Sequence, residues 1–462
     1  MSEVTKSSAL SRIESLLDEN SFVELGALVT ARSTDFNLNK LESPSDGVVI
    51  GHGLIDGNLV FVYSQDASVL NGSIGEMHAK KIVSVYDMAV KMGAPVIGIL
   101  DSTGVRLQES VDALEAIGTI YSKAVAASGV VPQITAVFGN CGGGLSVLPA
   151  ISDFAFMTEG GKLFVNSPDT IEGNRSDVND TASSEFQFKE AGSVDAIGSD
   201  DEIFDKIRQL VSILPSSNLD GGVDDECLDD LNRASEVAGM FDDPAAFARE
   251  ISDNHIIFEA KAGYATEMVT ALIKLDGLTV GVVGNREKDS DAVLTSHGAV
   301  KASDFVRFCD AFDIPVLTLT NLKGYDNSIE EEKRLTRALA KLTCSLAEAT
   351  VPKINVITKQ AVGTSYLIMN SKALGADLVY AYPETEMGIM EPALAAKIIG
   401  GEDLSAVADE FAEKNCGVNN AARRGAVDRI INTADTRKYL IAGFEMLYTK
   451  SVNESYKKHS TK

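Results

Sequence analysis

Residues 131–150, VPQITAVFGNCGGGLSVLPA, contain an apolar run that leads into a cluster of glycines and then into small and apolar residues. The apolar run is typical of a buried strand, and the glycines after it predict a tight turn into a helix. The same order recurs at an offset of 220 in the numbering, since VPKINVITKQAVGTS begins at Val351 where the first stretch begins at Val131. A strand, a glycine turn and a helix start that occur twice indicate a duplicated α/β unit.

Two further landmarks keep the same offset. Asp56-Gly57 in GLIDGNLVFV recurs as Asp276-Gly277 in ALIKLDGLTVGVV. Pro95, which opens PVIGIL, recurs as Pro315, which opens PVLTLT. An Asp-Gly pair between apolar runs predicts a β-hairpin in each half. Three landmarks in one register indicate internal duplication of the chain.

The segments between the landmarks predict the elements of each half. Residues 76–93, EMHAKKIVSVYDMAVKMG, predict an amphipathic helix that ends at Gly93, and the periodicity predicts a longer helix from about residue 107 to residue 128. Strands that alternate with helices predict an α/β fold with parallel sheets covered by helices. The Pro-, Ser-, Gly- and Asp-rich stretch 214–232 predicts a linker, so we expect two domains, residues 1–235 and 236–462.

The composition excludes several classes of partner and site. The 462 residues include 67 acidic and 41 basic ones, a net charge of -26 that disfavours nucleic acid or an anionic membrane as the main partner. Five scattered cysteines without a CxxC pair predict neither disulfides nor zinc and suit a cytoplasmic protein. The N-terminus lacks the apolar core of a signal peptide. The uncharged stretch 124–152 is interrupted by prolines and glycines, which favours buried strand, loop and helix start over a membrane span.

The glycine turn at residues 139–150 is the first candidate for chemistry. Glycines there allow close approach of a ligand, and successive N–H groups at a helix start bind anions. The turn matches neither the Walker A loop nor the GxSxG elbow, which leaves a backbone oxyanion hole that stabilises charge on a reacting oxygen. A packing turn without chemistry explains the glycines equally well. The repeat offset aligns Gly143 with Gly363 and Gly144 with Thr364.

Other side chains give weaker indications. Cys141 has no histidine near it in the sequence, and Ser365 lacks both a GxSxG context and an obvious base. The five histidines show no metal-ligand spacing, so no metal site is predicted. Four glutamates are candidates for acid or base work, namely Glu76, Glu109, Glu386 and Glu391.

The sequence resembles a known family, the carboxyltransferase component of biotin-dependent acyl-CoA carboxylases and decarboxylases. The resemblance covers most of the chain, from SDGVVIGHGLIDG at residue 45 to RRGAVDRIINTADTRKYL ending at residue 440. It implies an α/β fold of two tandem crotonase-like domains related by internal duplication. The first-half matches are GSIGEMHAKKIV, GAPVIGILDSTGVRLQESV, GNCGGGLSVLPAISDFAFM and LFVNSPDTI; the second-half matches are FEAKAGYATEMV, FVRFCDAFDIPVLTL, LAEATVPKINVIT and GADLVYAYPETEMGIM.

The resemblance also implies a division of labour between the domains. The first domain binds the acyl-CoA thioester, and its enolate oxygen would be held by the backbone donors of Gly143 and Gly144, with Gly142 beside them. The second domain binds biotin, and its ureido oxygen would be held by Thr364 and Ser365, within one residue of that register. Gly363, Gly324 and Tyr325 belong to the same implied biotin site.

This sequence departs from the family at the implied biotin site. Paired glycines followed by alanine are replaced by Gly363-Thr364-Ser365. A Pro-Gly-Phe loop is replaced by LKGYDNSIEEE, which keeps Gly324 and the aromatic Tyr325.

Coenzyme A carries phosphates, which need a local basic patch on an acidic protein. Lys80, Lys81, Arg106 and Lys123 are the candidates in the first half, with Arg106 and Lys80 taken as substrate-binding residues; for any one of them, an ordinary solvated helix charge is the better explanation.

The sequence contains neither a biotin-attachment segment nor room for a biotin carboxylase. The resemblance therefore implies a separate biotin carboxyl carrier protein, a biotin carboxylase subunit or a membrane decarboxylase subunit as partner, and a homo-oligomer with its active site between protomers. Two other functions stay open: a biotin-independent crotonase-type hydratase or isomerase, and a non-catalytic scaffold subunit. The acyl group and the direction, carboxylation or decarboxylation, are not fixed by the sequence.

Overall fold

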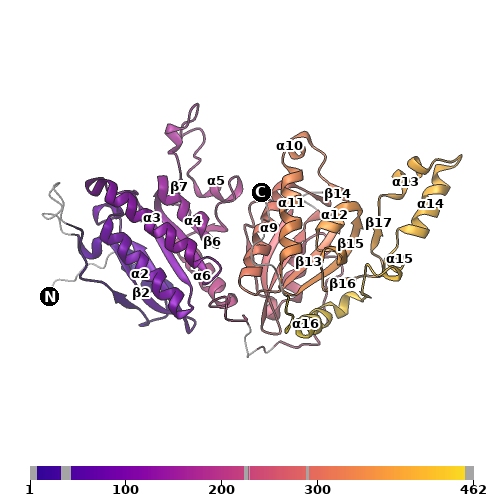
Figure 1. The fold of residues 1–462 in the computed structure, drawn as a ribbon, viewed down its shortest axis with the longest axis horizontal. Helices are drawn as coiled ribbons and strands as arrows, with labels where there is room; N and C mark the ends of the chain where they lie inside the picture. Colours follow the sequence, from indigo (N-terminus) through magenta and orange to yellow (C-terminus); the bar gives the residue numbers. More distant parts are fainter. Residues whose placement is uncertain (1–7, 33–42, 223–226, 228, 288–290, 453–462) are drawn as a thin grey trace. The chain divides into compact units, whose positions relative to one another are not determined.

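The computed structural model describes residues 8–32, 43–222, 227, 229–287 and 291–452. The chain forms two compact units, Met1–Asp220 and Gly221–Lys462, here called unit 1 and unit 2 (Figure 1). The division lies inside the segment 214–232 predicted as the linker, ahead of the expected boundary at residue 235.

Unit 1 is a mixed sheet covered by helices. Its strand order is β1-β2-β3-β4-β5-β6-β8, with β7 paired to the end of β5; the pairs along β3-β4-β5-β6-β8 are parallel and the others on the path antiparallel. The strands are β1 Val23–Leu25, β2 Val48–Ile55, β3 Asn58–Gln65, β4 Val96–Ser102, β5 Gln133–Gly142, β6 Phe154–Thr158, β7 Lys162–Phe164 and β8 Ala196–Gly198. The helices are α1 Ser8–Leu16, α2 Glu76–Met92, α3 Ser110–Ala127, α4 Val147–Ile151, α5 Ser184–Lys189 and α6 Asp200–Ile213.

Unit 2 repeats this topology as β9-β10-β11-β13-β15-β16-β18, with β17 paired to the end of β15. The strands are β9 Ile257–Ala260, β10 Met268–Leu275, β11 Leu278–Asn285, β13 Val316–Leu322, β15 Lys353–Val362, β16 Leu378–Ala381, β17 Glu386–Gly388 and β18 Arg429–Ile430, with a small sheet of β12 Val293–Leu294 and β14 Gly324–Tyr325. The helices are α7 Pro244–Ile251, α9 Ser296–Ala311, α10 Ile329–Glu332, α11 Leu335–Glu348, α12 Gly363–Ile368, α13 Pro392–Ile399, α14 Leu404–Asn415, α15 Val418–Arg423 and α16 Thr436–Leu447. Figure 1 shows α13 and α14 as a helical hairpin that extends away from the unit 2 sheet.

The predicted helices of the first half are confirmed. The apolar face of α2, which includes Ile82 and Val85, is buried in a core that also contains Ala116, Ile117 and Ile120 of α3. The helix ends at Gly93, whose φ of 64° is the left-handed conformation that favours glycine at a helix C-terminus. The second predicted helix begins later than residue 107, because residues 107–109 form a separate 3-10 turn before α3.

The two Asp-Gly dipeptides form the predicted hairpin turns, between β2 and β3 and between β10 and β11. Asp56 and Gly57 have φ of 48° and 83°, and Asp276 and Gly277 have φ of 52° and 75°. Two consecutive positive φ angles are the requirement of the two-residue turn that suits strand twist. The duplication is therefore reproduced in backbone conformation.

Each hairpin turn is bound by an aspartate from outside the hairpin. Asp18 accepts hydrogen bonds from the N–H groups of Asp56 and Gly57, both at 3.0 Å. Asp253 accepts the corresponding bonds from Asp276 at 3.1 Å and Gly277 at 2.8 Å. In each unit, the two backbone amides of the hairpin turn thus bind a single carboxylate.

An arginine from a late helix of each unit completes this arrangement. Arg208 of α6 binds Asp18 at 2.8 Å, and Arg437 of α16 binds Asp253 at 2.6 Å. Each guanidinium also donates to a carbonyl two residues before its aspartate, at Leu16 and Ile251. We call the two sets the turn clamps; they tie the first helix, the hairpin and a late helix of each unit together.

No helix among the described residues is long and apolar enough to cross a membrane.

The turn clamps differ in burial, which gives a prediction for stability. The Arg437 side chain is fully buried, whereas that of Arg208 is 26% exposed. Asp253→Ala leaves a buried guanidinium without its nearest partner, so we expect it to lower the free energy of unfolding by about 3–5 kcal/mol. Asp18→Ala, with water in reach, is expected to cost about 1 kcal/mol or less. Urea denaturation of both variants measures the difference; equal losses would show that burial does not govern the clamps.

Candidate active site

The glycine turn of unit 1 connects β5 to a short helix. Gly142 ends the strand, and Gly143 opens the 3-10 helix Gly143–Ser146 with φ of 61°. The first N–H groups of a helix have no carbonyl partner within it, so those of Gly143 and Gly144 are oriented away from the helix body. A Cβ built on Gly143 would meet no atom within 4 Å. The side of the turn on which a side chain would lie is therefore open.

A pocket of about 460 Å³ lies at this turn. It forms where β4 and β5 end, because parallel neighbouring strands bring their carboxyl ends to one edge of a sheet. The described residues that line it include no carboxylate, imidazole or amine. They are Ser102, Thr103, Gly104, Val105, Asn140, Gly142, Gly143, Gly144, Leu145 and Phe164.

Neighbouring side chains fix the turn. The Ser146 hydroxyl donates to the Gly143 carbonyl at 2.7 Å, and the Tyr121 hydroxyl of α3 donates to the Gly144 carbonyl. Gly142 lies against the Phe164 ring, where an added Cβ would come within 2.6 Å of ring carbons. With its carbonyls held, the turn keeps its amides in a defined direction.

The glycine turn of unit 2 has the same geometry. Gly363 opens α12 with φ of 68°, the counterpart of Gly143. Gly144 and Thr364 are both exposed, and the residues after them, Leu145 and Ser365, are both buried. The amides that correspond to Gly143 and Gly144 are therefore those of Gly363 and Thr364, one residue earlier than the expected pair Thr364 and Ser365.

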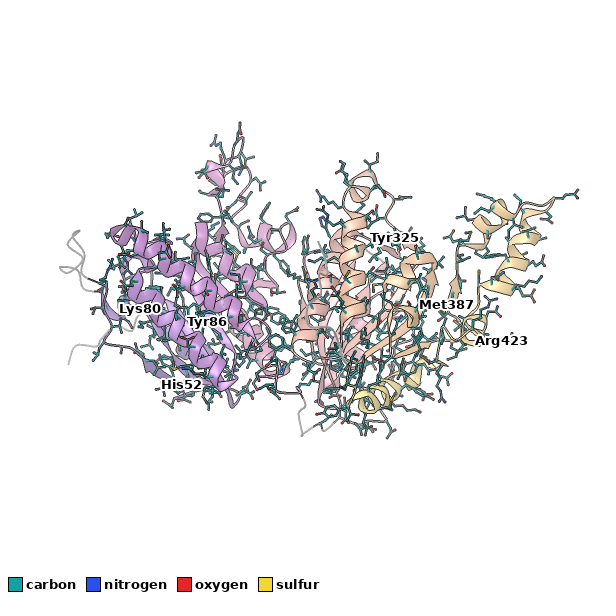
Figure 2. The ribbon with its side chains drawn as sticks, viewed as in Figure 1. His52, Lys80, Tyr86, Tyr325, Met387 and Arg423 are labelled. Atoms are coloured by element: carbon teal, nitrogen blue, oxygen red, sulfur yellow. The ribbon has the colours of Figure 1, made fainter. Side chains whose placement is uncertain are left out.

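The structure brings the predicted residues of the second half together. Gly324 and Tyr325 form β14, and the Tyr325 hydroxyl donates to the Thr364 hydroxyl oxygen at 3.0 Å. Tyr325 can be found by its label in the unit 2 part of Figure 2. Gly363 lies near the carbonyl of Ile389, with 3.4 Å between that oxygen and a built Cβ. One loop and one turn, distant in sequence, thus form a single candidate site.

Two candidate nucleophiles have structural roles. Ser365 is 1% exposed, and its hydroxyl donates to the Val362 carbonyl at 2.8 Å. Cys141 is fully buried, and burial raises the pKa of its thiol well above the ordinary range. The described residues contain no cluster of metal-ligating side chains.

The prediction that Arg106 belongs to a solvent-facing basic patch is wrong. Its side chain is fully buried, 2.7 Å from Asp46 and 2.9 Å from Glu109. The other Glu109 oxygen accepts the Glu76 N–H at the start of α2, at 2.7 Å. Glu109, one of the candidate bases, therefore has a structural role in this ion-pair cluster. A lone arginine in the sequence gave no sign of the two carboxylates that surround it.

Lys80 remains exposed and forms an ion pair with Glu76 at 2.6 Å within α2 (Figure 2). Lys81 points inward and binds the Ser45 carbonyl at 3.0 Å, and burial lowers its pKa to about 8. Lys123, the third lysine expected in the phosphate patch, forms an ion pair with Asp87 at 2.6 Å.

The sequence prediction missed the loop Ser102–Val105, which lines the pocket together with the glycine turn. The sequence does contain an indication of it, because Gly104 and Gly324 are related by the same repeat offset as the other landmarks.

Comparison with known proteins identifies the chain. The carboxyl transferase domain family matches residues 3–461. The chain belongs to this carboxyl transferase family. It is 38% identical to the methylmalonyl-CoA decarboxylase subunit alpha of Veillonella parvula, over 98% of this chain and 92% of that one. It is 37% identical to the propionyl-CoA carboxylase beta chain of Roseobacter denitrificans, over 98% and 93%.

Solved structures agree. A transcarboxylase 12S structure, described as a hexamer assembly with hydrolysed methylmalonyl-coenzyme A bound, matches with a TM-score of 0.94 and 34% identity over 98% of this carboxyl transferase chain and 92% of that chain. A single-chain long-chain acyl-CoA carboxylase, 22% identical with a TM-score of 0.79, shares the fold. The expected α/β fold of two tandem crotonase-like domains and the expected acyl-CoA carboxyltransferase family are confirmed.

The interior of unit 1 contains a buried histidine, which gives a prediction for pH dependence. His78 of α2 contacts Gln65 at the end of β3, and burial lowers the histidine pKa from 6.5 to about 3. Between pH 6.5 and 3 the unfolded chain binds a proton that the folded chain excludes, so stability is lost as pH falls. We expect His78→Gln to remove up to about 1.4 kcal/mol of this loss per pH unit. Urea denaturation of both proteins from pH 7 to pH 4 tests this; parallel profiles would contradict it.

Proposed function

We propose that this carboxyl transferase moves CO2 between carboxybiotin on a separate carrier protein and a short acyl-CoA thioester. The relatives named for propionyl-CoA and methylmalonyl-CoA suggest that pair as the substrates. The observation that carries the proposal is the occurrence, once in each unit and at equivalent positions of the repeat, of a left-handed glycine that opens a helix, Gly143 and Gly363.

In unit 1 the amides of Gly143 and Gly144 would bind the thioester oxygen. Removal of the α-proton places negative charge on that oxygen, and two fixed donors stabilise the charge more in the transition state than in the substrate. The pocket lining is apolar at Val105, Leu145 and Phe164, which suits a short acyl chain. The absence of a titratable group from the described lining disfavours a hydratase, which needs an acid or base side chain there.

In unit 2 the amides of Gly363 and Thr364 would bind the ureido oxygen of biotin. Biotin supplies the transferred carboxyl group, and its ring, once free of CO2, is basic enough to take the α-proton. The turn fits such a group, because its helix start is unobstructed by side chains at Gly363 and the exposed Thr364 hydroxyl lies next to it. The Tyr325 hydroxyl holds that threonine in place.

The remaining parts of the proposal concern ligands and partners. Lys80, exposed on α2, is the candidate for the coenzyme A phosphates, and Arg106 is withdrawn because of its burial. The carrier would be a separate biotin carboxyl carrier protein, and the complex would add a biotin carboxylase or a membrane decarboxylase subunit. We further propose a cytoplasmic homo-oligomer, as the hexameric transcarboxylase 12S suggests.

A transfer assay tests the proposal. Purified protein, a biotinylated carrier and methylmalonyl-CoA labelled with 14C in its free carboxyl group are expected to give labelled carboxybiotin and unlabelled propionyl-CoA. In the reverse direction, from labelled carboxybiotin, acetyl-CoA and long-chain acyl-CoA are expected to be poorer carboxyl acceptors than propionyl-CoA. Hydration or isomerisation of enoyl-CoA without any biotin-dependent transfer would favour the crotonase alternative. Binding of both partners without turnover would favour a scaffold.

The donors are tested by proline substitution at the second helical position of each turn. Gly144→Pro and Thr364→Pro each remove one N–H where proline is tolerated, in the first turn of a helix. We expect kcat to fall by about 10²–10³-fold, which is the loss typical of an enzyme from which one oxyanion-hole donor is removed. Gly144→Ala and Thr364→Ala keep the N–H and are expected to lose much less. A loss in the alanine variants equal to that in the proline variants would remove the amides from the mechanism.

A further inference from the structure

The strand that precedes each glycine turn contains an irregularity next to the site. In unit 1, β4 and β5 pair in register up to Leu100 and Val137 and resume at Ser102 and Cys141. Asp101 alone therefore lies opposite three residues of β5. Such irregularities re-aim a strand and are frequent beside active sites.

Unit 2 has the same irregularity at the equivalent position. There β13 and β15 pair up to Thr320 and Ile357 and resume at Leu322 and Ala361, which leaves Asn321 as the counterpart of Asp101. Because an unpaired backbone N–H in the interior is costly, each of these two residues needs an acceptor.

In both units the acceptor is the side-chain carbonyl of the last residue of the neighbouring strand. The Asp101 N–H donates to Gln65 Oε1 at 3.1 Å, and the Asn321 N–H donates to Asn285 Oδ1 at 2.9 Å. Backbone pairing along these strands extends to Ser64 with Ile99 in unit 1 and to Gly284 with Leu319 in unit 2. The amide side chain extends each ladder past the point where the backbone pairing stops, and we call these two contacts the amide bridges.

The environment of each amide fixes its direction. Gln65 is fully buried, and with Oε1 bound to Asp101 its Nε2 faces His78 Nε2 at 3.2 Å. His78 Nδ1–H in turn donates to the Asp46 carbonyl at 2.9 Å. Because Nε2 then accepts from the Gln65 amide, the imidazole is neutral. Asn285 is 1% exposed, and its Nδ2 donates to the Asn321 carbonyl. Both amides are thus held at their two ends.

The residues just after the bridged ones belong to the candidate sites. Ser102 to Val105 line the unit 1 pocket, and a Cβ built on Gly104 would lie 3.6 Å from the Gly142 carbonyl. In unit 2 the equivalent loop contains Gly324 and Tyr325, and the Tyr325 hydroxyl donates to that of Thr364. The amide bridge therefore determines where the loop beside each glycine turn begins.

We propose that Gln65 and Asn285 are positioning residues for carboxyl transfer, each fixing through one backbone amide the loop that lies beside the glycine turn of its unit. This inference rests on the proposed function for its kinetic consequence and on the structure alone for its effect on the loop. Gln65 would set the acyl-CoA side and Asn285 the biotin side. Displacement of a site by about 1 Å can cost about 10²-fold in rate.

Gln65→Met removes the acceptor at nearly the same volume. We expect the full-length variant to stay folded, with kcat/KM for the acyl-CoA reduced about 10–100-fold and faster hydrogen–deuterium exchange confined to the peptide that covers residues 101–106. Gln65→Glu keeps a carbonyl oxygen for Asp101 and is expected to restore most of the rate. In unit 2, Asn285→Leu and Asn285→Asp should behave likewise, with the loss expressed in KM for the biotinylated carrier.

Gln133→Met is the matched control. Gln133 is another buried glutamine, 1% exposed, and lies at the start of β5, whereas the glycine turn follows the end of that strand. Its Nε2 donates to the Ala124 carbonyl of α3. We expect it to lower stability with little change in kcat/KM or in exchange of residues 101–106. Equal kinetic losses in Gln65→Met and Gln133→Met, or unchanged exchange in Gln65→Met, would overturn the inference. Inactive wild-type protein would instead refute the proposed function, and the exchange measurement would still decide the role of Gln65.

Discussion

The left-handed backbone at Gly143 and Gly363 is the constraint on which the rest of the site depends. With φ of 61° and 68°, both glycines have the left-handed conformation at the residue where the strand gives way to a helix. Non-glycine residues pay about 1–2 kcal/mol for this conformation. In both turns a serine hydroxyl, that of Ser146 or Ser365, donates to a carbonyl of the turn, and in unit 1 the loop of residues 102–105 lies beside it.

A site built from amides has chemical consequences. Backbone donors need no protonation state, so they stabilise charge equally across the pH range in which the fold persists. Three buried charged residues of unit 1, Arg106, Asp46 and Glu109, pair with one another in the interior and act on structure. Proton transfer is then left to the reacting partners, in agreement with a transfer reaction between two activated carriers.

The sequence was sufficient for whatever depends on periodicity and on repeated spacing. The repeat offset predicted both hairpins, the strands that follow Pro95 and Pro315, and both glycine turns, because duplication keeps backbone requirements such as Asp56-Gly57 and Asp276-Gly277 visible. It was not sufficient for the interior pairing of Arg106, which involves Asp46 sixty positions away, nor for the amide bridges of Gln65 and Asn285. Both the ion pairs and the amide bridges depend on which side chains the sheet brings together. The bridges are also hard to find by comparing the two halves residue by residue, because a glutamine in unit 1 corresponds to an asparagine in unit 2. For the donors of unit 2, the repeat offset aligns Gly363 and Thr364 with Gly143 and Gly144, and the burial pattern of Thr364 and Ser365 agrees with that alignment rather than with the pair Thr364 and Ser365.

The turn clamps bear on how such a chain arose. In each unit a carboxylate near the first helix and a guanidinium from a late helix grip the same hairpin, so the beginning and the end of the unit are closed on its own sheet. All the contacts of each turn clamp lie within one unit. Duplication of one ancestral gene could therefore keep the clamp in both copies while other positions of the two halves changed, as Gly144 and Thr364 did.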